Sequence, residues 1–379
     1  MTGAGASSNI VLPDGIRPSD GRFGSGPSRV PHEAVAALAD AADGYLGTSH
    51  RRTGVRSVVA RLQAGFAELF SLPEDWEVVL GNGGATGLWD CLGFGLIRRR
   101  SQHLAFGEFS AKFARAVQAV PHLEAPQIVE APFGTHPEPV PADVDVYALT
   151  HNETSTGVQM PLRRPPEVGA VDGLVAVDAT SGAGGLRWDP AEVDVYYFSP
   201  QKCFAADGGL WVACCSPAAL ERIAEIGDSG RWCPPTLSLP LAVKNSAANQ
   251  TYNTPALATV FLTLQTVEWM CSKGGLEWAA GRCDASAETI YGWAEASDYA
   301  QPFVTEEAER SHVVATIDVD ADVADAGRIA TVLRANGIVD TESYRALGRN
   351  QLRISLFPAI PPGDVAALCA CIDHIVARL

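Results

Sequence analysis

The strongest constraint on the fold of this chain is an alternation between helical segments and short runs of β-branched and aromatic residues. It begins at about residue 32, where a helical segment opens behind Pro31, and residues 55–69 also have helical periodicity. Short apolar runs follow at residues 77–80, 144–150, 174–177, 194–198 and 209–214. Short strands that alternate with helices are typical of α/β proteins with a mostly parallel central sheet. We therefore predict this fold class.

The pattern changes after residues 256–270, which are predicted to form one long helix. Beyond it come a helix-rich stretch, two predicted strands at 312–319 and 353–357, and a final helix from Pro362. A length of 379 residues is compatible with two or three domains. We predict an N-terminal segment that packs with the small domain, a large α/β domain and a smaller α+β C-terminal domain, at residues 1–25, 26–265 and 266–379.

Charge and cysteine content narrow the function classes. The chain has 28 Lys and Arg against 44 Asp and Glu, a net charge of −16 that disfavours general nucleic-acid binding. The sequence contains no apolar run of about eighteen residues, which a membrane-spanning helix would need. The N-terminus lacks the pattern of a signal peptide. Nine cysteines without paired CxxC spacing argue against a zinc site and suit a reducing compartment. We expect a cytoplasmic protein that binds neither metal nor membrane.

Polar residues come soon after several of the predicted strands. Asp178 directly follows the run at 174–177, and Lys202 lies shortly after the run at 194–198. Ligands of open α/β sheets bind at the carboxyl ends of the strands, so these strand ends predict one common site.

Asp178 and Lys202 carry the chemistry that pyridoxal 5′-phosphate (PLP) requires. Burial among apolar neighbours lowers the pKa of a lysine, which Schiff-base formation needs. An acidic residue that pairs with the pyridinium nitrogen is the other half of PLP chemistry. Taken alone the pair is weak evidence, because an Asp at a strand end is a cap or turn residue about as often as a catalytic one.

A glycine loop and an aromatic residue strengthen this interpretation. Residues 83–86 follow a predicted strand and open a helix, so their N–H groups and the helix dipole form an anion site. Alone, the loop could equally be an ordinary strand-to-helix turn. Phe109, at the start of the next helix, is placed to stack on a flat cofactor, although read by itself it is a core residue.

Six motifs occur in the order and approximate spacing of one known family. They are Gly47–Arg51, Gly83–Ala85, Asn152–Thr154, Val177–Ser181, Ser199–Lys202 and Tyr252–Pro255. The chain resembles phosphoserine aminotransferases, class-V aminotransferases of PLP fold type I, over nearly its whole length. It is most similar to their actinobacterial branch.

The resemblance implies roles around the cofactor ring. Lys202 would bind PLP covalently and, once freed, move a proton between the substrate Cα and the cofactor. Asp178 would keep the pyridine nitrogen protonated. Phe109 would stack on the ring, where many family members carry Trp, and Thr154 would hydrogen-bond the ring hydroxyl or the phosphate end.

The resemblance also implies contacts to the cofactor phosphate. Gly84, Ala85 and Gln201 would bind it from the same chain, although many family members have Arg where Ala85 stands. Asn253 and Thr254 would reach it from the partner subunit, which implies a homodimer with shared active sites.

Arginines are expected to bind the anionic substrates, since a guanidinium matches carboxylate and phosphate geometry. Arg353 corresponds to the family arginine for the α-carboxylate, and His50 and Arg51 to the pair that meets the substrate phosphate or the side-chain carboxylate of glutamate. A further family His-Arg pair is replaced here by Tyr344-Arg345. Arg345 and Arg349 therefore both remain candidates for a second phosphate contact.

The resemblance implies reversible amino transfer between L-glutamate and 3-phosphohydroxypyruvate, giving O-phospho-L-serine and 2-oxoglutarate in serine biosynthesis. A second expected activity forms 4-phosphohydroxy-L-threonine on the route to pyridoxine. The alternatives are another class-V enzyme, such as an alanine–glyoxylate aminotransferase or a cysteine desulfurase, and a non-catalytic PLP-binding protein. A desulfurase needs a mobile catalytic cysteine, and none of the nine lies in an obvious flexible loop.

Overall fold

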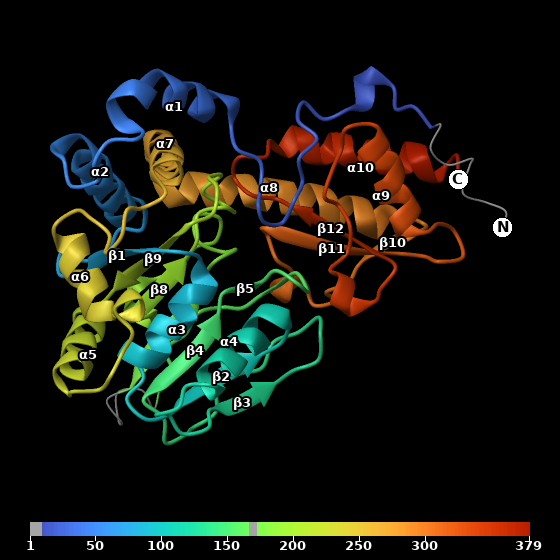
Figure 1. The fold of residues 1–379 in the computed structure, drawn as a ribbon. Helices are drawn as coiled ribbons and strands as arrows, with labels where there is room; N and C mark the ends of the chain where they lie inside the picture. The colour runs from blue at the N-terminus through green and yellow to red at the C-terminus, as the bar shows by residue number, and fades with distance from the viewer. Residues whose placement is uncertain (1–9, 167–172) are drawn as a thin grey trace, which may run out of the picture.

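A seven-stranded sheet forms the centre of the computed structural model, which describes residues 10–166 and 173–379 (Figure 1). In spatial order its strands are β1 (Glu77–Asn82), β9 (Leu210–Cys215), β8 (Val195–Phe198), β7 (Leu174–Asp178), β4 (Val146–Thr150), β2 (Ser101–Ala105) and β3 (Gln127–Glu130). β9 is antiparallel to both of its neighbours, and every other pair is parallel. The predicted α/β fold with a mostly parallel sheet is confirmed.

Helices cover both faces of this sheet, which is why its central strands are apolar at nearly every position. One face packs on α2 (Thr53–Leu69) and α7 (Leu257–Lys273), and α1 (His32–Tyr45) lies against α7. The other face packs on α3 (Ala85–Gly95), α4 (Glu108–Gln118), α5 (Pro217–Asp228) and α6 (Leu239–Ala247). Alternate residues of β7 enter the two cores, with Val175 and Val177 on one side and Leu174 and Ala176 on the other.

The C-terminal part has its own three-stranded antiparallel sheet and its own core. The strands are β10 (Ala300–Pro302), β11 (Val314–Val319) and β12 (Gln351–Ser355), covered by α8 (Gly275–Ala296), α9 (Ala326–Ala335) and α10 (Pro362–Val376). Leu12 and Phe23 of the N-terminal segment are buried in this same core. The division at residues 25 and 265 stays a prediction, and residues 1–9 of its first segment lie outside the described residues.

Shorter elements complete the chain. β5 (Asn152–Glu153) and β6 (Val158–Gln159) form a two-stranded ribbon beside the main sheet. Single 3₁₀ turns occur at Asp14–Ile16, Pro190–Glu192, Pro235–Leu237, Glu307–Glu309 and Arg345–Leu347. Among the described helices, none is long and apolar enough to cross a membrane.

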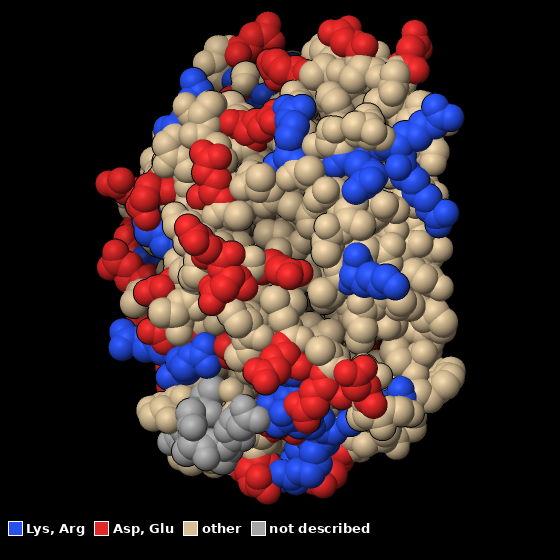
Figure 2. Space-filling view, turned by 90° about the vertical axis from the view of Figure 1, so that its left-hand side faces the viewer, with Lys and Arg blue, Asp and Glu red and all other residues tan. Residues whose placement is uncertain are grey.

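Acidic and basic side chains are unevenly distributed over the face that lies at the left of Figure 1. Figure 2 shows one group of Lys and Arg toward the upper right of that face, whereas the other Lys and Arg, at its left and near its lower edge, are interspersed with Asp and Glu. A local group of basic side chains therefore coexists with the net charge of −16.

The sheet brings the predicted strand ends to one edge. β1, β8, β7, β4 and β2 run in the same direction, since β1 and β8 are both antiparallel to β9 and the others are parallel. Their carboxyl ends therefore lie together, and the polar residues after them can contact one ligand.

Candidate active site

A cavity of about 280 Å³ lies at this edge of the sheet. Eight of the predicted site residues line it: Gly84, Ala85, Phe109, Thr154, Asp178, Gln201, Lys202 and Arg353. They come from the carboxyl ends of β1, β2, β4, β7 and β8, or from the segments that follow those ends, and from β12 of the C-terminal sheet. The structure thus brings together residues that the sequence places up to 269 positions apart, between Gly84 and Arg353.

Lys202 extends into the cavity with its amine shielded from solvent. Its Nζ donates a hydrogen bond to Thr154 Oγ1 at 2.8 Å and lies 5.2 Å from the centre of the Phe109 ring. Burial lowers the pKa of Lys202 to about 8, against the opposing effect of the Asp178 and Glu153 carboxylates. The amine is therefore much more readily deprotonated than an ordinary lysine, as Schiff-base chemistry requires.

Asp178 is the last residue of β7, and both of its carboxylate oxygens accept hydrogen bonds. Its Oδ2 accepts a hydrogen bond from Trp89 Nε1 at 3.0 Å, and its Oδ1 accepts one from the backbone N–H of Thr180 at 2.9 Å. Trp89 is buried on α3, and the sequence analysis assigned it no role. Its indole nitrogen orients the carboxylate toward the cavity.

The glycine loop makes the start of α3 an anion site. Gly83 has a φ of +106°, a conformation that favours glycine, and Gly84 caps α3 without a side-chain hydrogen bond. The first N–H groups of α3 and the positive end of its dipole adjoin the cavity next to Ala85. A phosphate is the kind of group that such a helix start binds.

Buried polar atoms that lack a hydrogen-bond partner indicate whether a cofactor fits this cavity. Within the described residues, five such atoms belong to the lining of this cavity: Ser25 Oγ, Asn152 Oδ1, Thr180 Oγ1, Gln201 Oε1 and Arg353 Nε. Buried polar groups are normally hydrogen-bonded, so this set indicates a polar ligand. An amine, an opposing carboxylate, an aromatic ring and a helix N-terminus around one cavity fit a phosphorylated pyridine.

Arg353 reaches this edge from β12. Its Nη1 donates to the carbonyl oxygen of Thr154 at 3.4 Å, and its guanidinium lies 5.3 Å from the Tyr344 ring centre. Burial lowers the pKa of Arg353. Tyr344 also contacts Phe109, at 5.9 Å between ring centres, so it lies between the predicted cofactor and substrate residues.

Arg345 and Arg349 lie outside this cavity and differ in their partners. Both line an adjoining cavity of about 730 Å³ that shares Tyr344 and Arg353 with the first. Arg349 is bound to Asp318 through two hydrogen bonds and packs over the Phe303 ring at 4.5 Å. Arg345 is exposed and has no ion pair with any other described residue. The structure therefore favours Arg345 over Arg349 as the arginine available to a ligand.

Four predicted residues form a separate group on the surface. Thr254 Oγ1 and His50 Nδ1 are hydrogen-bonded at 3.1 Å, and Asn82 accepts from Asn253 N–H at 3.3 Å and donates to Thr254 O at 2.9 Å. Arg51 follows His50 and is exposed. None of His50, Arg51, Asn253 and Thr254 lines the cavity of their own chain.

The cavity also contains residues to which the sequence assigned no role. Asn152, Thr180 and Ser181 belong to motifs already noted, so their positions carried a signal. Ser25 and Gly26 carried none, because they lie before the first predicted helix and reach the Lys202 cavity only in the folded chain. A Cβ at Gly26 would lie 2.7 Å from Lys202 Cε.

Comparison with known proteins identifies the family of this chain. Residues 133–343 match the class-V aminotransferase family. The phosphoserine aminotransferase of Rhodococcus jostii (strain RHA1) is 56% identical over 374 residues, covering 98% of this chain and 100% of that protein. The phosphoserine aminotransferase of Rhodococcus opacus (strain B4) is 55% identical with the same coverage.

The fold is similarly matched by solved structures. The phosphoserine aminotransferase from Cytophaga hutchinsonii superposes with a TM-score of 0.84 at 24% identity, over 93% of this chain and 99% of that one. The architecture is that of PLP-dependent enzymes of fold type I. The chain therefore belongs to the class-V aminotransferases and, within them, to the phosphoserine aminotransferase family.

Proposed function

We propose that the protein is a PLP-dependent aminotransferase that exchanges an amino group between L-glutamate and 3-phosphohydroxypyruvate in serine biosynthesis. The products are 2-oxoglutarate and O-phospho-L-serine. The observation that carries the proposal is the single cavity in which the buried Lys202 amine, the held Asp178 carboxylate and the Arg353 guanidinium meet. Formation of 4-phosphohydroxy-L-threonine is proposed as a second activity.

The cofactor supplies an electron sink for the pair released when the substrate Cα loses its proton. Asp178, held by Trp89 and Thr180, would keep a ring nitrogen protonated through a charge-assisted hydrogen bond. The start of α3, with Gly84 and Ala85, would bind the phosphate together with Gln201, whose Oε1 has no partner among the described residues. The Phe109 side chain would cover one face of the ring.

Lys202 would carry the proton in the transfer step. With its pKa lowered to about 8, roughly a quarter of free Lys202 amines are neutral at pH 7.5, against about one in a thousand for an ordinary lysine. The neutral amine can take the proton from the substrate Cα and return it one bond away. Thr154, which accepts from Nζ, positions the amine for that transfer.

Two arginines would bind the substrate. Arg353 would pair with the α-carboxylate, whose negative charge would offset the desolvation cost that lowers the pKa of Arg353. Arg345 would bind the substrate phosphate from the adjoining cavity, because Arg349 is already bound to Asp318.

We further infer a homodimer in which the surface group of His50, Arg51, Asn253 and Thr254 completes the cavity of the second subunit. Its support is that these family motif residues lie together, and outside their own chain's cavity. A cytoplasmic location is part of the proposal, and the nine free thiols support it.

The test records the visible absorption of the holoenzyme during each half-reaction. L-Glutamate and O-phospho-L-serine should each bleach the cofactor band, and 2-oxoglutarate should restore it. Lys202→Ala should abolish both responses, and Lys244→Ala, an exposed lysine on α6, should leave them unchanged. A response to glutamate but not to phosphoserine would assign another class-V substrate, and a bound cofactor that responds to neither would indicate a binding protein.

A second measurement tests Arg345. Arg345→Ala should raise KM for O-phospho-L-serine by about tenfold or more and change KM for glutamate much less, since only the former carries a phosphate. Arg328→Ala, an exposed arginine on α9, is the matched control. Equal effects on both substrates would contradict the phosphate contact.

A further inference from the structure

A second cavity, of about 400 Å³, lies between the start of α1, α7, α8 and the turn before α10. It shares no lining residue with the active-site cavity. The two are nevertheless neighbours along the chain, because Arg29 lines this cavity and Ser28 Oγ donates to the backbone oxygen of Lys202 at 2.8 Å.

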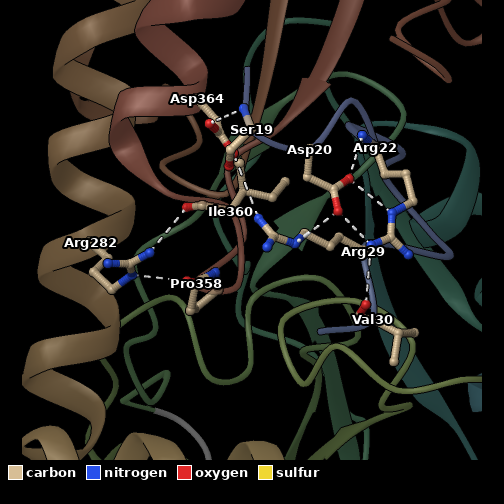
Figure 3. Close-up of polar contacts among 9 residues, drawn as sticks. All are labelled: Ser19, Asp20, Arg22, Arg29, Val30, Arg282, Pro358, Ile360 and Asp364. Atoms are coloured by element: carbon tan, nitrogen blue, oxygen red, sulfur yellow. Dashed lines mark hydrogen bonds and ion pairs between the residues drawn. The ribbon is translucent and has the colours of Figure 1, made fainter. Parts of the chain in front are cut away.

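Arg282 of α8 supplies a positive charge that no acidic side chain of the described residues pairs with. Its Nε donates to Pro358 O at 2.9 Å and its Nη2 to Ile360 O at 3.5 Å (Figure 3). Its guanidinium lies 5.2 Å from the Trp278 ring and 5.8 Å from the Trp269 ring. In the part of the chain that the structure describes it forms no ion pair, and burial lowers its pKa, so an anion beside it would be stabilised.

Arg29 brings a second guanidinium to the same cavity. Figure 3 shows it between Asp20 and Asp364, at 3.3 and 3.6 Å from their carboxylate oxygens. Nε and Nη1 are the atoms that face these two carboxylates, and neither makes a hydrogen bond to another described residue. The charge of Arg29 is among the causes of the lowered Arg282 pKa, so the two guanidinium groups are close enough to repel each other.

An unsatisfied hydroxyl and two helix starts add neutral donors. Thr266 of α7 is 3% exposed, and its Oγ1 has no hydrogen-bond partner in the described chain. Pro31 and Pro361, the N-cap residues of α1 and α10, both line the cavity and provide no side-chain cap. The N-terminal dipoles of these two helices, of 14 and 15 residues, add positive potential, which Glu33 and Asp364 in their first turns partly offset.

We propose that this cavity is a binding site for a small organic monocarboxylate. Its carboxylate would lie between Arg282 and Arg29 and accept the hydrogen bond that Thr266 Oγ1 lacks. Its apolar part would pack on Trp269. Glu33 lines the cavity and is exposed, and its charge would repel a doubly charged phosphate more strongly than a monocarboxylate.

The test uses 4-fluorobenzoate as the probe and its ¹⁹F NMR signal as the readout, on the holoenzyme carrying Arg353→Ala. That background removes the active-site arginine, which could also bind a carboxylate. We expect saturable line broadening with a Kd of about 0.1–10 mM, a range typical of a ligand with so few atoms. Acetate should displace the probe more effectively than inorganic phosphate.

Substitutions of residues that line the cavity then test whether the ¹⁹F line broadening comes from binding at this cavity. Arg282→Ala should raise the Kd by about tenfold or more, while Arg328→Ala leaves it unchanged. Thr266→Val should raise it by about threefold or more without loss of thermal stability, since the hydroxyl it removes has no partner. This variant keeps the test valid if Arg282→Ala does not fold.

Three results would overturn the proposal: no saturable binding up to about 20 mM, an unchanged Kd in Arg282→Ala or Thr266→Val, or displacement by phosphate in preference to acetate. The site does not depend on the proposed amino transfer. Binding without amino transfer would contradict only the proposed function, and amino transfer without binding only this site.

Discussion

At the scale of single residues, the chemistry of the protein depends on the burial of one amine. Lys202 is 7% exposed, and burial lowers its pKa to about 8 from a usual 10.5. A buried amine that resists protonation costs stability, because the unfolded chain binds that proton more readily. The same environment therefore prepares the amine for reaction and weakens the fold.

The cost of Lys202 predicts a particular pH dependence in the cofactor-free protein. Below pH 8 the burial of the Lys202 amine lowers the free energy of unfolding by its full amount. Between pH 8 and 10.5 the unfolded state binds more protons than the folded state, so the free energy of unfolding rises with pH in this range. Lys202→Met should thus be more stable than the parent by on the order of 2–3 kcal/mol at pH 7 and by almost nothing near pH 10.5. Urea unfolding across this range measures the difference.

Lys244→Met is the matched control, because Lys244 is exposed. It should follow the parent protein at every pH. A Lys202→Met advantage that stays constant from pH 7 to 10.5 would show that the amine titrates normally in the folded state.

Glu153 holds the residues around Lys202 in place. Its fully buried carboxylate accepts hydrogen bonds from the N–H and Oγ of Ser110 and of Ser155, at 2.7–3.1 Å, and from Phe109 N–H at 3.4 Å. It therefore fixes the start of α4, which carries the Phe109 ring. Its negative charge also raises the pKa of Lys202.

Glu153→Gln should accordingly lower the pKa of Lys202 below about 8 and destabilise the protein by about 1–3 kcal/mol, because donors lose a charged acceptor. The chain has only four lysines, so ¹³C reductive methylation gives resolvable NMR signals for titrating Lys202. Glu108, an acid on α4 that pairs with Lys112, provides the control, and Glu108→Gln should leave the pKa of Lys202 unchanged. A Lys202 pKa that is unchanged or raised in Glu153→Gln contradicts the charge effect.

At the scale of elements, the segment from residue 19 to residue 30 links the C-terminal core to the catalytic lysine. Ser19 donates to both carboxylate oxygens of Asp364, at 2.7 and 2.8 Å. Further along, Ser28 donates to Gln201 O and Lys202 O, and Gly26 packs against the Lys202 side chain. Gly26 has a φ of +132°, which side chains rarely adopt.

Gly26→Ala should therefore disturb both the segment and the lysine. The new Cβ would lie 2.7 Å from Lys202 Cε, so the lysine must move, and the backbone strain should cost about 1–3 kcal/mol. Thermal unfolding and cofactor affinity are the measurements, and both should fall. Gly15→Ala, at a position with open space and an ordinary φ, is the control, and equal behaviour of the two variants would rule out the close approach.

At the scale of the whole molecule, the active site is assembled across the two cores. The main sheet supplies Asp178 and Lys202, and the C-terminal sheet supplies Arg353 through β12. The proposed homodimer adds a third source, the surface group around His50 and Thr254.

Subunit complementation tests that third source. Lys202→Ala should be inactive, and a combined His50→Ala, Arg51→Ala and Thr254→Ala variant nearly so. After the two are unfolded and refolded together, about a quarter of the parent activity should return, since half of the dimers are mixed and each holds one intact site. Mixing Lys202→Ala with Asp178→Ala, whose defects lie in the same cavity, should recover nothing. Failure of the first mixture to regain activity would exclude shared sites.

Some of this could be predicted from the sequence because it is encoded locally. The alternation of strands and helices predicted the sheet, and the strand ends predicted that Gly84, Asp178 and Lys202 would meet. The last helix begins at Pro362 as expected, while β12 runs from Gln351 to Ser355 instead of 353–357, because its register is set by pairing with β11.

Other features were decided only by tertiary structure. The choice between Arg345 and Arg349 depends on Asp318, and the Asp178 orientation depends on Trp89. The approach of Gly26 to Lys202 likewise joins distant segments. Periodicity and strand ends are properties of neighbouring residues, which a sequence displays directly. Contacts between distant segments follow from how the cores pack, and no local pattern encodes them.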